Sequence, residues 1–163
     1  MKRSALITIV LALALALPVA TFAGQGENSP ATGTLVGSWV ASVTPDPASG
    51  VPPFRELFTF HNDGTLTMTD DNAPAPPFPF TPGHGVWKKS DQVNYVFHYL
   101  NLIYDPASYA SNGQTSITVH VKLGDDRDSF SGTGHLKVSD NAGNVLFEAD
   151  GTISATRITI DQP

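Results

Sequence analysis

The sequence predicts an all-β protein, folded as an eight-stranded antiparallel up-and-down β-barrel with one closed end and one open end that carries proline-rich loops. Apolar and polar residues alternate with a period of two almost everywhere after residue 32, most cleanly in "TSITVHVKL" and "SFSGTGHLKV". Short turn signals such as "NDG" and "DNAG" separate the alternating segments. No segment after the N-terminal region carries the apolar stripe of an amphipathic helix.

The N-terminal region predicts export. Lys2 and Arg3 precede the apolar run "ALITIVLALALAL", which is short for a membrane span, and Ala23 supplies a small residue for cleavage. We expect three segments: a signal peptide over 1–23, a flexible leader over 24–32 and one calycin-like barrel domain over 33–163. A secreted or periplasmic location follows, with no stable insertion in a membrane after cleavage.

Composition limits the partners of the chain. Removal of Lys2 and Arg3 with the signal moves the formal net charge from −6 to −8, so nucleic acid is not an expected partner. The chain has no cysteine, which excludes disulfides and a lipid-modified cysteine. Stability must therefore come from a hydrophobic core or a closed sheet. An exported chain without cysteine is typical of bacteria.

Turn signals bound the expected strands, which are 34–44, 55–61, 65–70, 84–89, 92–104, 114–123, 128–138 and 144–158. In an up-and-down barrel alternate connections lie at the same end. The long connections "PDPASGVPP", "DNAPAPPFPFTPG" and "DPASYASNG" then share one end, which we expect to be the open one. Their prolines either hold Phe78, Phe80 and Tyr109 over the opening or only keep exposed connections from pairing.

The tripeptide Gly37–Ser38–Trp39 opens the first expected strand, and Arg157 lies near the end of the last one. Barrel closure makes these strands neighbours, so the guanidinium can stack on the indole at the closed end. The pattern resembles the lipocalin family, or the wider calycin group, in which a Gly-X-Trp near the start of the first strand packs against a late arginine. The resemblance implies that Trp39 and Arg157 form a barrel plug.

Two departures favour a minimal bacterial calycin-like barrel over a classical transport lipocalin. The connection "GDDRDSF" lacks a Thr-Asp-Tyr-type motif, and no helix follows the last strand. The size and the glycine-rich late strands also resemble the allene oxide cyclase and dirigent-like barrels. That resemblance implies an isomerase or cyclase that works inside an apolar cavity.

The inward-facing residues predict a binding site for a small hydrophobic or amphipathic ligand, open near residues 76–82. We expect the cavity to be lined by Phe58, Met68, Phe97, Tyr99, Ile117 and Phe147. The segment 92–104 is apolar on both faces, so its outer face is expected to be covered by a loop or by a second copy in a homo-oligomer. A third possibility is a fully packed barrel that acts as a protein-interaction module.

Glu56 and Tyr99 are the weak candidates for catalysis. If Glu56 points inward beside Phe58, burial would raise its pKa and allow it to act as an acid or to bind a ligand. The sequence rather favours a bulge near Pro53 that leaves Glu56 in solvent. No thiol or Gly-X-Ser-X-Gly nucleophile is present, and an enzymatic activity is the less favoured interpretation.

No metal or cofactor is expected. The histidines lack the spacing of a preformed metal site. His120 and His135 fall on the polar faces of adjacent strands, and we expect both to be solvated without a carboxylate to orient them.

Overall fold

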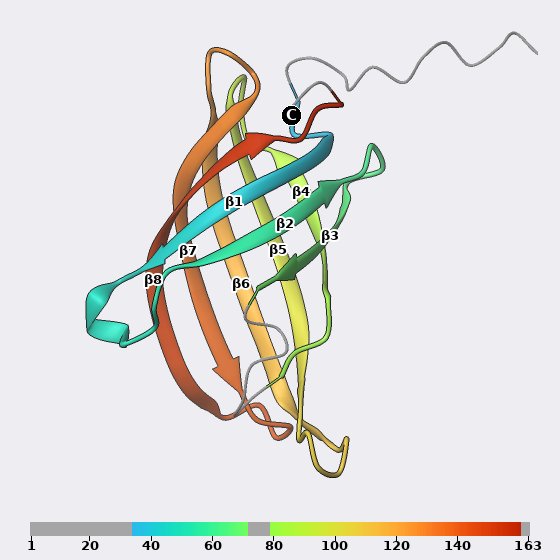
Figure 1. The fold of residues 1–163 in the computed structure, drawn as a ribbon, viewed down its shortest axis with the longest axis vertical. Coiled ribbons are helices and arrows are strands. Elements are labelled where there is room, and N and C mark those ends of the chain that lie inside the picture. Colours follow the sequence, from blue (N-terminus) through green and yellow to red (C-terminus); the bar gives the residue numbers. More distant parts are fainter. Residues whose placement is uncertain (1–33, 72–78, 161–163) are drawn as a thin grey trace, which may run out of the picture.

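The computed structural model describes residues 34–71 and 79–160, and these form a closed eight-stranded antiparallel barrel with the strands in sequence order (Figure 1). The predicted fold class and strand order are therefore confirmed. The expected signal peptide and leader lie outside the described residues.

Each strand falls within a few residues of its predicted position. The elements are β1 (Gly37–Pro45), the 3₁₀ helix η1 (Pro47–Ser49), β2 (Phe54–Phe60), β3 (Thr65–Asp70), β4 (Gly83–Lys89), β5 (Asn94–Tyr104), β6 (Ser111–Leu123), β7 (Ser129–Ser139) and β8 (Val145–Arg157). Antiparallel pairing of β1 with β8 closes the barrel. The connections after β5 and β7 lie at the lower end in Figure 1, and the connection after β1 lies at the left of the view.

The first strand begins later than predicted, because Gly37 has a φ of 123°. This value is accessible to glycine and strained for other residues, so the chain changes direction there. The preceding Leu35 turns under the barrel and is fully buried. Its carbonyl accepts a hydrogen bond of 2.8 Å from Nε1 of Trp39, which ties the entering chain to the strand that follows.

Strand β2 has no bulge near Pro53, so that sequence-based expectation is wrong. Its pairing with β1 runs without interruption from Gly37 opposite Phe60 to Val43 opposite Phe54. The continuous register places Glu56 on the same inward face as Phe58 and Phe60. Its exposed fraction is only 4%.

Aromatic rings fill the closed half of the barrel interior. Phe97 lies 5.4 Å from Phe58, 5.1 Å from Phe60 and 6.3 Å from Phe130 between ring centroids. Trp39 packs against Phe130 at 5.0 Å. Tilted and edge-to-face pairs of this kind stabilise a core by about 0.5–1.5 kcal/mol each beyond their burial. This half of the interior is therefore packed by side chains.

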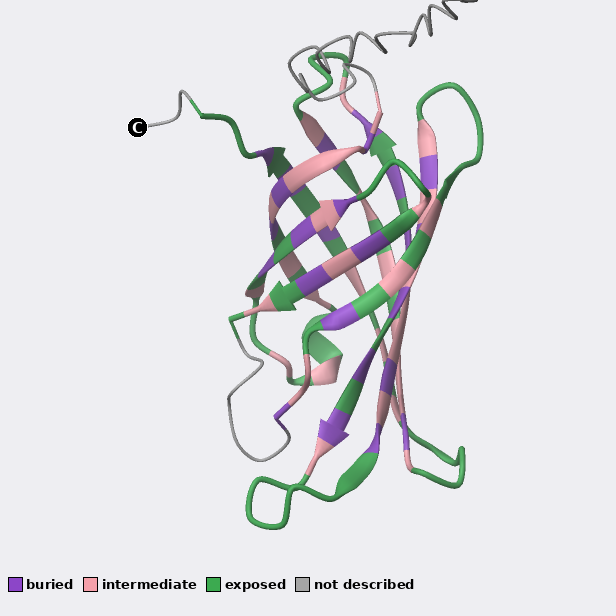
Figure 2. Ribbon diagram, turned by 90° about the vertical axis from the view of Figure 1, so that its right-hand side faces the viewer, coloured by how far each residue is buried: buried purple, intermediate pink, exposed green. Residues whose placement is uncertain are grey.

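The outer face of β5 is open to solvent among the described residues. Leu100 and Leu102 point outward and are 39% and 54% exposed, and Val86 on β4 is 59% exposed. Exposed and buried residues alternate along the strands in Figure 2. In the two described segments, no helix has the length and apolar character needed to cross a membrane.

Candidate ligand-binding site

The open half of the barrel contains a cavity of about 750 Å³. Its walls come from inward-facing residues of all the strands except β4, together with Pro45, Val51, Pro52 and Phe80 from the strand ends and loops of the open end. Most of these side chains are apolar. Valine, isoleucine and phenylalanine alternate with outward polar residues here, so the cavity follows directly from the period-two pattern of the strands.

Four of the six predicted ligand-binding residues line this cavity: Met68, Tyr99, Ile117 and Phe147. Phe58 and Phe97 lie below it, where each packs against the ring of Tyr99 at 5.7 Å and 6.3 Å. The sequence placed all six on the inward face without indicating where along the barrel the packed core would end. Phe58 and Phe97 therefore support Tyr99 at the floor of the cavity.

Glu56 and Tyr99 meet at the inner end of the cavity. The Tyr99 hydroxyl donates a hydrogen bond of 2.7 Å to Oε1 of Glu56, and both residues line the cavity. Burial raises the pKa of Glu56 to about 8, the Tyr99 hydrogen bond acts in the opposite direction, and the charges of Asp70 and Asp71 raise it further. Burial also raises the pKa of Tyr99 well above its usual value. The carboxyl group of Glu56 is therefore a buried acid that is mostly protonated, and so uncharged, at neutral pH.

Asp70 is a site residue that the sequence analysis missed. It lies directly opposite Glu56 in the β2–β3 ladder, so the two side chains share the inward face. It also lines the cavity. The pairing of Asp70 with Glu56 could have been predicted from the hairpin. The turn at 61–64 pairs Phe60 with Leu66, and the same register continues to Glu56 and Asp70.

Asn101 is a structural anchor as well as a lining residue. Its amide donates to the carbonyl oxygen of Thr81 at 2.9 Å and accepts from Oγ1 of Thr115 at 3.0 Å. These bonds attach the end of the connection before β4 to β5 and β6. Asn101 therefore positions one edge of the cavity, with its hydrogen-bonding capacity largely used inside the protein.

The aromatic residues of the open-end loops have different environments. Phe80 lines the cavity and pairs with Ile103 through an isolated bridge. Tyr109 is 80% exposed and stacks on Tyr104 at 6.4 Å between ring centroids. Phe78 and the start of the predicted opening at 76–82 lie outside the described residues.

Trp39 and Arg157 lie together at the closed end, remote from the cavity. The guanidinium carbon is 4.1 Å from the centroid of the indole ring. Arg157 also donates to the backbone carbonyls of Thr34, Val36 and Arg127 and to Asp128 at 2.7–3.0 Å. A buried guanidinium with this many partners joins the entering chain, the β6–β7 turn and β8.

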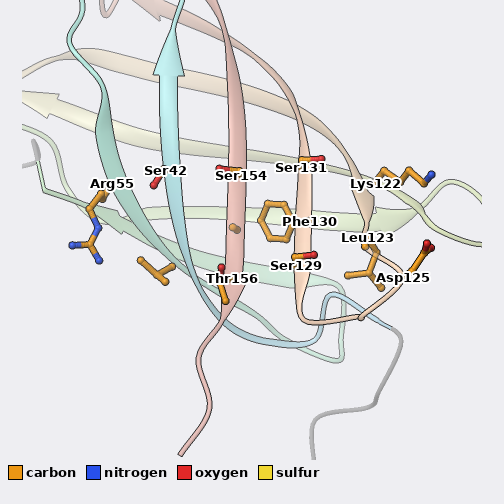
Figure 3. Close-up of a pocket in the computed structure, with 13 residues that line it drawn as sticks. Ser42, Arg55, Lys122, Leu123, Asp125, Ser129, Phe130, Ser131, Ser154 and Thr156 are labelled. Atoms are coloured by element: carbon orange, nitrogen blue, oxygen red, sulfur yellow. The ribbon is translucent and has the colours of Figure 1, made fainter. Parts of the chain in front are cut away.

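A second hollow, of about 600 Å³, lies on the outer surface across β1, β8 and β7. Figure 3 shows Ser42, Ser154 and Ser131 on these three neighbouring strands, with Arg55 and Lys122 beyond them on either side. The register places all five in one row across the sheet. Each of these side chains is exposed, so water competes for every polar contact, and the inner cavity is the stronger candidate.

The expectation that His135 lacks a carboxylate partner is wrong. Its Nδ1 lies 2.8 Å from Oδ1 of Asp150, and its Nε2 lies 3.8 Å from Glu148. These groups are all at least half exposed, so the contacts contribute little to stability. Within the part of the chain that the structure describes, no group of three or more potential ligands is arranged to hold a metal ion.

Comparison of the chain with models of known protein families, with curated proteins and with solved structures gives no match. The eight-stranded antiparallel barrel is consistent with the architecture of a lipocalin-like barrel.

Proposed function

We propose that this chain is an exported, lipocalin-like protein that binds a small, mostly apolar molecule inside the barrel. The cavity of about 750 Å³ carries the proposal. Small-molecule sites are typically concave, mostly apolar and about 300 to about 1,000 Å³ in volume, with a few polar groups that orient the ligand. Glu56 and Tyr99 are polar groups of this kind, and they lie at the inner end of a mostly apolar space.

Mass spectrometry under native conditions tests the proposal directly. The protein is purified from its own host and examined for a bound small molecule. A discrete added mass that is lost on denaturation is the expected result. If none is found, displacement of a fluorescent apolar probe from the purified barrel is the second measurement, and absence of probe binding would overturn the proposal.

Gly134 offers a variant that fills the cavity. It lines the cavity on β7, and a Cβ added there would meet Val119 Cγ2 at an ordinary 3.5 Å. Gly134→Leu should therefore extend into the empty space without displacing backbone, and should weaken ligand or probe binding by about tenfold or more. The neighbouring Thr133→Leu adds a leucine to the exposed face of the same strand and should leave binding unchanged. Equal binding by both variants would contradict a site at this position.

A second candidate function is an isomerase or cyclase that uses proton transfer, as the resemblance to allene oxide cyclase implies. The hydrogen-bonded Glu56–Tyr99 pair inside the cavity favours it, because a carboxyl group with a pKa of about 8 can exchange a proton near neutral pH. Incubation of the identified ligand with the protein in deuterated water separates the candidates. Deuterium in a recovered ligand, absent with Glu56→Gln, supports catalysis, and an unchanged ligand supports binding alone.

The outer face of β5 is the proposed place for self-association. Leu100 and Leu102 are exposed there beside Val86 of β4. Analytical ultracentrifugation should show a dimer that Leu102→Lys dissociates. A monomer at all concentrations would remove this part of the proposal. The packed interaction module is less favoured, since the open half of the interior is hollow.

A further inference from the structure

Only one oxygen of the buried Glu56 carboxyl group is bonded within the described protein. The exposed fraction of Glu56 is 4%, and the Tyr99 hydroxyl donates to its Oε1 at 2.7 Å. The second oxygen, Oε2, makes no hydrogen bond to the described residues. Glu56 lines the cavity, so a molecule in the cavity can reach this side chain. Buried polar atoms normally have a hydrogen-bond partner, and a ligand can supply the partner of Oε2.

The groups that face Glu56 from the neighbouring strands carry no positive charge. On β1 its partner is Ala41, and on β3 it lies opposite Asp70, with Asp71 adjoining. Tyr99 faces it from β5 and donates a neutral hydrogen bond. The charges of Asp70 and Asp71 both disfavour ionisation of Glu56.

The far wall of the cavity supplies no positive charge either. The inward-facing lining residues of β6, β7 and β8 are uncharged. Asp150 lies on the outer face of β8, where it contacts His135 at 2.8 Å. Asp140 lies in the turn after β7 and accepts hydrogen bonds from Ala142 and Asn144. Among the described residues, the ionised form of Glu56 therefore has no cation to stabilise it.

A carboxyl group in these surroundings keeps its proton at neutral pH. Burial is the main cause, and it raises the pKa of Glu56 to about 8. A protonated carboxyl group contains one carbonyl oxygen that accepts and one hydroxyl that donates. Because Oε1 accepts from Tyr99, the hydroxyl is placed at Oε2. Glu56 can then act as a hydrogen-bond donor to a ligand.

We propose that the cavity selects neutral, apolar molecules that carry a carbonyl group, and that the Oε2 hydroxyl of Glu56 donates a hydrogen bond to the carbonyl oxygen. This inference rests on the proposed binding function and names the chemical class of its ligand. A hydrocarbon of the same shape would leave the buried hydroxyl unpaired, which costs binding free energy. A carboxylate ligand would bring a further negative charge towards Asp70 and Asp71.

The hydrogen bond makes binding depend on pH in a defined direction. A ketone does not titrate, whereas Glu56 loses its proton as the pH rises through about 8. The ionised carboxylate cannot donate, and it repels the carbonyl oxygen. Ketone affinity should therefore fall as the pH rises. Because the ketone favours the protonated form, its binding near pH 8 and above should take up protons from solvent.

Competition of 2-acetylnaphthalene, 2-isopropenylnaphthalene and 2-naphthoate with a fluorescent apolar probe tests the inference. The three ligands have the same shape and differ in the head group, which is a ketone, an alkene or a carboxylate. The ketone-to-alkene affinity ratio should fall by about tenfold or more between pH 6 and pH 9.5, because only the ketone loses a hydrogen bond. At pH 7 the ketone should bind more tightly than 2-naphthoate.

The infrared band of the ketone gives a second measurement on the unaltered chain. A carbonyl group that accepts a hydrogen bond stretches at lower frequency than the same group in a hydrocarbon solvent. With an isotope-labelled carbonyl, the bound ketone should show this lower frequency at pH 6. The band should move towards its hydrocarbon position at pH 9.5.

Glu56→Gln separates hydrogen-bond donation from ionisation. The glutamine oxygen can accept from Tyr99, and its amide donates at every pH, so the ketone-to-alkene ratio should become independent of pH. Glu56→Met removes the donor and should lower this ratio by about tenfold at pH 6. Glu148→Gln changes an exposed carboxylate on the outer face of β8, and should keep the pH dependence of the unaltered chain.

A ketone-to-alkene ratio that stays constant or rises with pH would overturn the inference and leave the binding function intact. Tighter binding of 2-naphthoate than of the ketone would do the same. If the Glu56 variants do not fold, a carbonyl band at its hydrocarbon position at pH 6 overturns the inference without them. Failure of all three ligands and of the fluorescent probe to bind would instead overturn the proposed function itself.

Discussion

The hydroxyl of Tyr99 lies 2.7 Å from Oε1 of Glu56, and it joins two residues that are 43 positions apart in the sequence. Glu56 is brought inward by the unbroken register of β2, and Tyr99 by the alternation of β5. Their bond spans the interior at the boundary between the packed half and the hollow half. A carboxyl group whose pKa is raised strongly by burial therefore lies at the inner end of the cavity, next to the packed core.

Glu56 should make the stability of the protein fall as the pH rises. Its pKa is about 8 in the folded protein and close to the ordinary 4.5 when unfolded, so the unfolded chain loses this proton first. The free energy of unfolding should fall by about 1.4 kcal/mol per pH unit within this window and level off above it. Urea unfolding from pH 4 to pH 9 measures the effect. Glu56→Gln is the control, and an identical pH dependence in that variant would contradict the assignment.

Tyr99→Phe should raise the pKa of Glu56 further. The Tyr99 hydrogen bond lowers that pKa, and phenylalanine keeps the ring contacts while removing the donor. The pH at which stability levels off should therefore move upward from about 8, and carbon NMR of labelled glutamate should show the same shift. Tyr95→Phe, on the same face of β5 nearer the closed end, should leave this titration unchanged. A downward shift in Tyr99→Phe would refute the prediction.

Trp39→Ala should cost about 3–5 kcal/mol of stability, because the ring is fully buried and its removal leaves a cavity. Trp87 is a matched comparison, since its Nε1 also donates to a backbone carbonyl, that of His61 at 2.9 Å. It is only partly buried, so Trp87→Ala should cost about half as much or less. Thermal and urea unfolding give both values. Similar losses in the two variants would show that burial does not set the difference.

Arg157→Lys should destabilise the protein by about 2–4 kcal/mol although the charge is kept. An ammonium group cannot reproduce the indole stacking together with the bonds to Thr34, Val36 and Arg127. Asp128→Asn removes only the ion pair with Arg157. The Asp128 side chain is 62% exposed, so this loss should cost about 1 kcal/mol or less. If the two variants lose equal stability, the ion pair and not the carbonyl bonds dominates.

Much of the fold was predictable because it depends on local chemistry. The alternation in 114–123 and the turn signals between strands determine which residues pair, and both can be read from short segments. The start of the first strand was not predictable from alternation. It depends on the positive φ of Gly37 and on Leu35 turning back to accept the Trp39 hydrogen bond, which is a tertiary contact.

The site was predictable only in part. How far side chains fill the barrel along its axis depends on residues from several strands together. The alternation of β2 puts Glu56, Phe58 and Phe60 on one face, but it does not show which of them borders empty space. That boundary depends on how Phe58, Phe60, Phe97 and Phe130 interlock, and they come from three regions of the chain. Proline near the start of β2 favoured a bulge, and the continuous ladder with β1 overrode that local preference.

The aromatic layer that fills the closed half has a kinetic consequence. Among the described residues, Phe58 and Phe97 close the inner end of the cavity. If a ligand binds there as proposed, it should exchange through the open end. An incoming competitor cannot push the occupant through the barrel. The first ligand must therefore dissociate before the competitor can bind. The observed rate of displacement should equal the dissociation rate of the first ligand and should not depend on competitor concentration.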